Sequence, residues 1–329
     1  MNIQRRRIIG AAAAAAALGT PAFNAAAQGS LAWPTKPVRL IVPNAPGGAS
    51  DVVTRLMQGE LQKVWNQQVI VEYKPGAGTV LGTDYVARSA PDGYTLGVVL
   101  TSHVINPGLR KSLPYDTLKD LAHVCMTGTT NLLLSASPKF GPNNLKELID
   151  SAKSKPGKLS YATAGAGSSM HLAGELLKQK ADIYMLHIPY KGTGSGAYSD
   201  VFDGRVELII DPVPSSMPFV RGGQLKPIAV LSTKRDPLFP NVPAAGEIFP
   251  GFDARSINGI VAPAATPRDL VQKISADFGR ALRTETLRTR FREMGLEPAP
   301  SSPQEFENFV RAEVKRWDTV IKRANIALD

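Results

Sequence analysis

Short apolar runs alternate with amphipathic helical segments along most of the chain, and this alternation constrains the fold more than any other feature. The β-rich run 38–42 precedes a segment, 50–65, whose apolar side chains recur at helical spacing, namely Val53, Leu56, Met57, Leu61, Val64 and Trp65. Strands are then predicted at 68–73 and 94–100, with a helix at 82–90 between them. Strands that alternate with helices in this way predict a largely parallel α/β sheet.

A second series of the same kind follows a long apolar strand predicted at 123–138. It consists of a helix at 144–157, a strand at 159–164, a helix at 169–180, strands at 184–190, 206–211 and 225–232, and short helices between these strands. The strand 256–263 returns to the first series and precedes helices at 267–282, 287–294 and from Pro303 onward. Two α/β units joined by two extended crossings predict two lobes with a cleft between them. We place lobe 1 at 28–131, lobe 2 at 132–252 and a C-terminal return to lobe 1 at 253–329.

The first 27 residues have the pattern of a secretory signal peptide. Arg5, Arg6 and Arg7 form a basic start, residues 8–18 form a weakly apolar run rich in alanine, and residues 25–27 offer a cleavage site before Gln28. The apolar run is shorter than the roughly 20 residues that span a bilayer. Paired arginines favour twin-arginine export, although a Sec signal also fits. We expect residues 1–27 to be a signal peptide and the mature chain to be exported.

Composition narrows the class of protein further. The chain has 329 residues, of which 43% are apolar, and this is enough for one or two domains with their own cores. The only cysteine, Cys125, cannot form an internal disulfide and lies in an apolar run that predicts burial. The net charge is +10, but the lysines and arginines are mixed with acidic residues along the chain and form no basic block. No nucleic-acid partner is therefore expected.

Two glycine-rich junctions between a strand and a helix are the strongest candidates for a binding site. The first contains Asn44, Ala45, Gly47, Gly48, Ser50 and Asp51, and the second contains Gly165, Ala166, Gly167, Ser168, Ser169 and His171. Glycines allow backbone N–H groups to turn inward, and the helix that follows adds unpaired donors and the positive end of its dipole. Each predicted lobe carries one such loop, so together they predict a site for a small anion.

The spacing of these residues argues against more specific chemistry. Neither loop has the lysine of a phosphate loop, and Met170 stands where a dinucleotide fingerprint needs its third glycine. Around Ser169 the nucleophile motif G-x-S-x-G fails because His171 replaces the second glycine. His171 either points into the cleft or forms a hydrogen bond near the helix start. The four histidines lack metal-ligand spacing, so neither a metal nor a cofactor is expected.

Further candidates lie where other predicted strands end. They are Thr101, Ser102 and Asn106 after the strand 94–100, Tyr190 and Lys191 after 184–190, and Asp211 at the end of 206–211. Asp211 either faces an ammonium group of the ligand or caps the next short helix. At the second glycine loop, Gly167→Asp is expected to abolish binding while leaving the fold intact.

Several longer stretches, read in order, resemble one family. They include "KPVRLIVPNAPGGASDVVTRL", "VEYKPGAGTVLGTDYVARSAPDGYTLG", "KPGKLSYATAGAGSSMHLAGELLK", "HIPYKGTGSGAYSDVFDGRVELIIDPVPSSMPFVRGGQLKPIAV" and "SINGIVAPAATPRDLVQKI". The chain resembles the Bug receptors, which are the periplasmic solute-binding components of tripartite tricarboxylate transporters. The resemblance extends over essentially the whole chain after the signal peptide.

This resemblance implies a two-lobed periplasmic binding protein of the Venus-flytrap type, in which the two glycine loops hold one carboxylate of a small organic acid. It also implies an integral-membrane permease as the partner. The chain departs from the family pattern at Asn44, where an aromatic residue is common, and at Ile257 and Asn258, where a tryptophan–tyrosine pair is common. These departures predict a more polar or roomier pocket, suited to a hydroxylated or amino-bearing acid.

The sequence therefore predicts an exported, monomeric receptor that closes on a small carboxylate without covalent chemistry. An exported serine hydrolase that uses Ser169 and His171 is the alternative from another class. A sensor that hands its ligand to a signalling partner is a third possibility, which the sequence does not separate from transport.

Overall fold

The structure is a computed structural model that describes residues 32–47, 49–192, 194 and 196–328. The predicted signal peptide, residues 1–27, lies outside the described residues. Backbone contacts divide the chain after Trp33, and the compact unit Pro34–Asp329 contains all the helices and strands described below. None of the described helices combines the length and the apolar character needed to cross a membrane.

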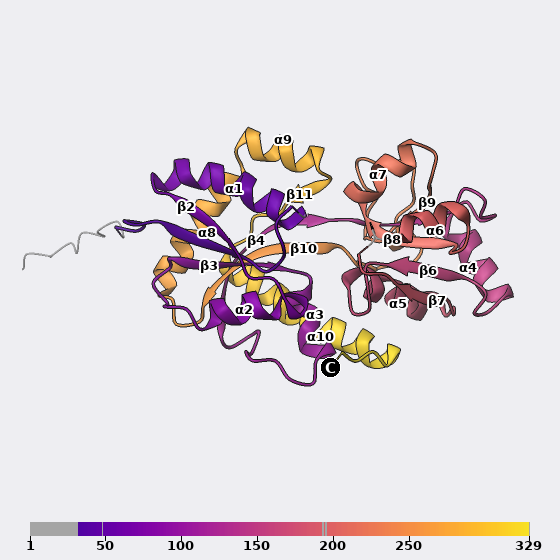
Figure 1. Cartoon of the computed structure of the whole chain (residues 1–329), viewed down its shortest axis with the longest axis horizontal. Coiled ribbons are helices and arrows are strands. Elements are labelled where there is room, and N and C mark those ends of the chain that lie inside the picture. The colour runs from indigo at the N-terminus through magenta and orange to yellow at the C-terminus, as the bar shows by residue number, and fades with distance from the viewer. Residues whose placement is uncertain (1–31, 48, 193, 195, 329) are drawn as a thin grey trace, which may run out of the picture. The chain divides into compact units, whose positions relative to one another are not determined.

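The first lobe is built on a six-stranded sheet (Figure 1). Across the sheet the strands follow the order β11 (Leu296–Pro298), β4 (Leu121–Thr130), β10 (Ser256–Pro263), β3 (Thr95–Leu100), β1 (Val38–Val42) and β2 (Val69–Tyr73). Its helices are α1 (Ala49–Trp65), α2 (Val80–Ala87), α3 (Ser102–Leu109), α8 (Arg268–Leu282), α9 (Glu285–Glu293) and α10 (Pro303–Ala324), with a short 3-10 turn, η1 (Ala77–Thr79), before α2.

The second lobe is built on a five-stranded sheet with the order β7 (Leu186–Pro189), β6 (Ser160–Thr163), β8 (Leu208–Pro212), β5 (Leu132–Ala136) and β9 (Lys226–Val230). Its helices are α4 (Leu145–Ser154), α5 (Ser169–Ala181), α6 (Ala197–Asp203) and α7 (Val213–Arg221), and a 3-10 turn, η2 (Ala245–Glu247), follows β9. Both sheets with their helices confirm the predicted two-lobed α/β fold.

Both sheets are mixed, which differs from the predicted, mainly parallel arrangement. The pairs β1–β2, β1–β3, β6–β7 and β6–β8 are parallel, as strands joined through helices require. The antiparallel pairs are made by β10 and β11 in the first sheet and by β5 in the second. Of these strands, β5 and β10 enter their lobes directly from a crossing, whereas β11 follows α9 within the first lobe.

The crossings between the lobes are short and lie side by side. The apolar stretch predicted as one strand at 123–138 is two strands, because β4 ends at Thr130 and β5 begins at Leu132 in the other sheet. The return crossing leads into β10, which pairs with β4 from Ser256 opposite Thr130 to Pro263 opposite Leu121. Asn131 is thus the single residue that separates the two sheets on the first crossing.

The last helix, α10, packs against both lobes. In the first lobe Phe306 fills the space over Gly259 of β10, where an added Cβ would lie 2.3 Å from the phenyl ring. In the second lobe the side-chain amide of Gln179, on α5, donates to the carbonyl of Val320 at 2.9 Å. One cluster of buried apolar side chains includes residues of both sheets together with Trp317 and Phe306 of α10. Cys125 is also buried, as predicted.

Two histidines are buried side by side beneath the first sheet. His103 of α3 and His123 of β4 face each other with their Nε2 atoms 3.1 Å apart, and the His123 ring packs edge-on against Phe306. Burial lowers the pKa of His123 to about 4. Burial and the neighbouring His123 also hold the pKa of His103 well below its usual range. Both rings are therefore neutral at pH 7.

We predict that acid destabilises the fold through this pair. The pKa of His123 is lower in the folded chain than in the unfolded one, so its stabilising contribution is complete above pH 6.5 and is lost as the pH falls towards 4. Urea unfolding at pH 7 and pH 4.5 should show a fall in unfolding free energy to which His123 contributes about 2.5 kcal/mol. In His123→Gln the fall should be smaller by that amount, and an equal fall in both proteins would contradict the assignment.

Candidate ligand-binding site

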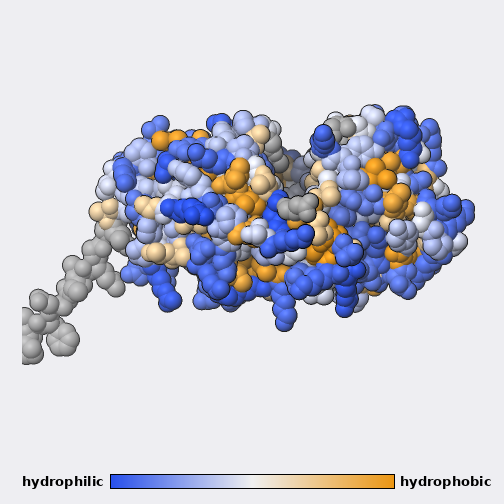
Figure 2. Space-filling model, turned by 60° about the horizontal axis from the view of Figure 1, so that its bottom comes forward, coloured by the Kyte–Doolittle hydropathy of each residue, from blue (hydrophilic) through white to orange (hydrophobic). Residues whose placement is uncertain are grey.

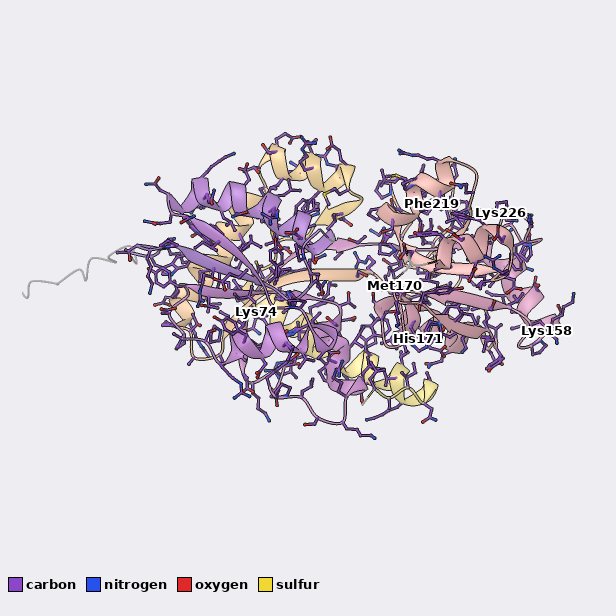
Figure 3. All side chains as sticks on the ribbon, in the orientation of Figure 1. Lys74, Lys158, Met170, His171, Phe219 and Lys226 are labelled. Carbon is purple, nitrogen blue, oxygen red and sulfur yellow. The ribbon has the colours of Figure 1, made fainter. Side chains whose placement is uncertain are left out.

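A cavity of about 370 Å³ lies between the two lobes and is lined by residues from both. Nine of the residues predicted from the sequence line it: Asn44, Ser50, Thr101, Ser102, Gly167, Ser168, Ser169, Ile257 and Asn258. Figure 2 shows the surface indented between the two lobes. In Figure 3, Met170 and His171, which follow the second glycine loop, lie at the edge of the second lobe that faces the first.

A larger hollow of about 910 Å³ lies on the outer surface of the first lobe. All of its lining residues belong to that lobe, and its charged groups largely pair with one another, as Arg88 does with Asp84 at 2.8 Å. We assign the candidate site to the smaller cavity because there the predicted loops of both lobes meet.

Among the described residues, those that line the cavity carry no formal charge. Its polar groups are neutral donors and acceptors, mainly the hydroxyls of Ser50, Thr79, Thr101, Ser102, Thr130, Ser168, Ser169, Ser215 and Ser256 and the side-chain amides of Asn44 and Asn258. Among the described residues, no group of three or more histidine, cysteine or carboxylate side chains could hold a metal ion. Recognition at this wall therefore depends on hydrogen bonds and on helix dipoles.

Five helices begin at this wall, and each begins beside a residue that lines the cavity. They are α1 after the first glycine loop, α2 after Thr79, α3 at Ser102, α5 at Ser169 and α7 just after Pro212. The N-terminal end of a helix carries unpaired N–H donors and about half a positive charge. The convergence of five such ends makes the cavity attractive to an anion, although none of the described lining residues has a cationic side chain.

The first glycine loop is held from behind by Asp51. Its carboxylate accepts hydrogen bonds from the amide of Gly47 at 2.8 Å, from Tyr73 Oη at 2.6 Å and from Arg55 Nε at 2.9 Å. The hydrogen bond from Tyr73, followed by that from Gly47, holds the pKa of Asp51 below its usual range. Asp51 therefore supports the loop and does not line the cavity.

The front of the first loop reaches the cavity through Asn44, whose side-chain amide donates to Ser50 Oγ at 3.3 Å. Ala45 and Gly47 are exposed and lie outside the cavity wall, and Gly48 lies outside the described residues. Helix α1 begins at Ala49, so Ser50 and Asp51 belong to its first turn, and neither is its cap.

The second loop is rigid because its polar groups bond to one another. Ser168 caps α5, since its Oγ accepts from the amide of His171 at 3.2 Å and donates to the carbonyl of Gly165 at 2.8 Å. The neighbouring Ser169 Oγ lies 3.5 Å from Ser256 Oγ across the cavity. Of the two serines, Ser168 is thus a structural cap and Ser169 remains available to a ligand.

His171 is part of the support for this loop. Its Nδ1 accepts from the amide of Gly167 at 3.1 Å, and its ring stacks on His187 with centroids 3.7 Å apart. Burial lowers the pKa of His171, so the ring is neutral at pH 7. Of the two predicted orientations, the structure supports the hydrogen bond near the helix start, because His171 does not line the cavity.

Six other predicted residues also lie outside the cavity wall, namely Asn106, Gly165, Ala166, Tyr190, Lys191 and Asp211. Asp211 is buried and accepts from Tyr198 Oη at 2.5 Å, so neither predicted role fits, and Pro212 precedes α7 instead. Tyr190 donates to Asp200 at 2.5 Å. Buried aspartates are normally paired in this way, whereas sequence alone shows only that Asp211 ends a strand.

Sequence reasoning missed several lining residues. Met294 follows α9, Leu296 begins the unpredicted strand β11, and Thr79 ends the 3-10 turn η1 before α2. Ser256 directly precedes the predicted Ile257, and Thr79 ends the glycine-containing stretch "KPGAGT". Those two positions carried a local signal, whereas Met294 and Leu296 reach the site only through the tertiary fold.

Two α/β lobes around a cavity of neutral donors define the chain as a solute-binding receptor with the fold of periplasmic binding proteins. Residues 53–326 match the family model "Tripartite tricarboxylate transporter family receptor", and the chain belongs to this family. A relative, the protein BugT of Bordetella pertussis, is 34% identical over 299 residues, which cover 90% of this chain and 91% of that protein.

Two solved structures of similar proteins contain a ligand. MatC from Rhodopseudomonas palustris, with bound malate, is 32% identical with a TM-score of 0.74, covering 88% of this chain and 100% of that one. An R. palustris protein solved with adipate is 31% identical with a TM-score of 0.77, covering 90% of this chain and 99% of that one. Both resemblances extend through the two lobes.

We predict that Gly167 is required by the fold, in contrast to the expectation from sequence. Its φ is +73°, and an added Cβ would lie 2.6 Å from Leu328 Cδ1 and 2.9 Å from Leu109 Cδ1. Gly167→Ala should therefore lower the unfolding free energy by about 1–3 kcal/mol in urea titrations.

Gly47→Ala is the matched control, because Gly47 also has a positive φ, +89°, but nothing lies within 4 Å of its added Cβ. It should cost less than Gly167→Ala, and Leu328→Ala should remove most of the difference. Equal costs at the two glycines would show that the contact with Leu328 is unimportant.

Proposed function

We propose that the chain captures a small organic carboxylate in the cavity between its lobes and delivers it to the membrane permease of a tripartite tricarboxylate-type transporter. The observation that carries this proposal is the convergence of five helix N-termini on an uncharged wall. Malate and adipate, the ligands found in the two similar structures, are both carboxylates.

The two glycine loops hold the carboxylate from opposite sides. From the first lobe, Ser50 and Asn44 offer a hydroxyl and an amide, and α1 adds the donors of its first turn. From the second lobe, Ser169 adds a hydroxyl beside the capped start of α5. Because a carboxylate binds between groups of both lobes, it favours the arrangement in which the lobes lie close together.

A serine hydrolase fits these residues less well. In His171, Nδ1 already accepts the amide of Gly167, and Nε2 lies 3.8 Å from Glu175 Oε1. The hydroxyl of Ser169 faces the hydroxyl of Ser256, on the other lobe. A general base must reach the hydroxyl that it activates, and this arrangement does not provide one. We therefore retain binding without covalent chemistry.

Residues 1–27 direct export in this proposal, by the twin-arginine or the Sec route, and the mature receptor works as a monomer in the periplasm. The lobes divide at 131/132 and 252/253, close to the crossings into β5 and β10. A sensory role would use the same cavity and would differ only in the partner that recognises the closed form.

A thermal-shift screen tests the proposed ligand class. Mono- and dicarboxylates, hydroxy acids, amino acids and aromatic acids are each added to the purified protein, and a carboxylate is expected to raise the melting temperature. A ligand present at 100 times its Kd stabilises the native state by about 2.7 kcal/mol. A screen in which none of these acids raises the melting temperature would contradict the proposal.

The two serines of the second loop should separate stability from affinity. Ser168→Ala removes the cap of α5 and should cost about 1 kcal/mol of unfolding free energy. Ser169→Ala should leave stability within about 0.5 kcal/mol and weaken binding of the best carboxylate, measured by calorimetry, about tenfold. The reverse assignment of effects would show that Ser168 contacts the ligand.

Incubation with activated esters tests the alternative function. The wild-type protein and Ser169→Ala should show the same background rate of hydrolysis. Turnover that disappears in Ser169→Ala would establish the hydrolase and overturn the proposal of binding alone.

A further inference from the structure

Thr79 has an unusual backbone conformation for its residue type. Its φ is +80° and its ψ is −5°, in the left-handed region. The other described non-glycine residues with positive φ are Asn66, Ala77, Asp182 and Asn325, so Thr79 is the only β-branched residue among them. Asparagine and aspartate adopt this region readily, whereas a β-branched side chain is strained there. The chain keeps a threonine where glycine or asparagine would fit with less strain.

The helix that follows does not explain this threonine. Thr79 is the N-cap residue of α2, but its side chain forms no capping hydrogen bond. Its Oγ1 lies instead 2.8 Å from Ser102 Oγ, at the start of α3. Both residues line the cavity, and Thr79 is only 9% exposed. The hydroxyl therefore serves the cavity wall and not the start of its own helix.

The position of this hydroxyl is fixed by α3. The side-chain amide of Asn106 donates to the carbonyl of Gly78 at 3.0 Å, and Arg110 Nη2 donates to the carbonyl of Ala77 at 2.9 Å. These two contacts hold the loop before Thr79, so the two hydroxyls stay together at one place on the wall.

Counting protons shows what the hydroxyl pair can bind. Each hydroxyl has one donor and two acceptor sites. Whichever oxygen donates within the pair, one O–H group is left, together with three acceptor sites. Such a pair can donate to a carboxylate oxygen, or donate to and accept from a hydroxyl group. It therefore suits an oxygen function of the ligand.

We propose that Thr79 and Ser102 form a subsite of the first lobe that takes a second oxygen function of the ligand, either a hydroxyl or a second carboxylate. Thr79 is then a specificity-determining residue that favours bifunctional acids over simple ones. The subsite is separate from the two glycine loops, which hold the first carboxylate, and the inference rests on the proposed function.

Matched acids and matched variants test this subsite. The probes are butyrate, succinate and malate, and hexanoate and adipate for a longer chain, with Kd measured by calorimetry. The variants Thr79→Ser and Thr79→Ala both remove the β-branch, and they differ by one oxygen atom. Thermal unfolding without ligand checks that the two variants are equally well folded.

Wild type and Thr79→Ser should bind the bifunctional acid of at least one chain length about tenfold or more tighter than the matching simple acid. In Thr79→Ala this preference should fall about tenfold, while the Kd of the simple acid stays within twofold. Ser102→Ala should reproduce the effect.

Two results would overturn the inference in different ways. If the acids bind and the preference is the same in Thr79→Ala as in wild type, the subsite is wrong and the proposed function stands. If none of the five acids binds the wild-type protein, the proposed function fails and the subsite fails with it.

Discussion

The meeting of five helix N-termini at one cavity is the constraint on which the candidate site depends. Five helices from two lobes begin at one cavity, and the lining residues that the structure describes include no charged side chain. The N–H donors of their first turns and the positive ends of their dipoles make this place favourable for an anion. Because the donors come from both lobes, a ligand that contacts both sets favours the arrangement in which the lobes lie close together.

This arrangement explains why the charged and titratable residues beside the site have supporting roles. Asp51 holds the first loop through the amide of Gly47, and His171 holds the second through the amide of Gly167. Each accepts a backbone donor and so fixes the direction of the remaining ones. A carboxylate on the wall itself would repel an anionic ligand, whereas behind the wall the Asp51 carboxylate orients the loop.

Sequence periodicity predicted most of the fold because the helices and strands of an α/β protein differ in how their apolar residues are spaced. The return strand 256–263 and the helix from Pro303 coincide with β10 and α10. Helix α3 was missed because "NPG" within it is typical of a turn, and β11 because three residues carry no periodic signal. The predicted strand 123–138 is divided at Asn131, since the two halves pair in different sheets.

For the site, the sequence by itself determined the two glycine loops, their place before helices and the absence of phosphate, dinucleotide and nucleophile motifs. These are local properties that residue type and spacing fix. Only the tertiary structure decided which side chains of each loop reach the cavity, because packing turns Ser169 towards Ser256 and His171 towards Gly167. It also decided that Met294 and Thr79 belong to the wall, since residues far apart in the chain meet there only after both sheets have formed.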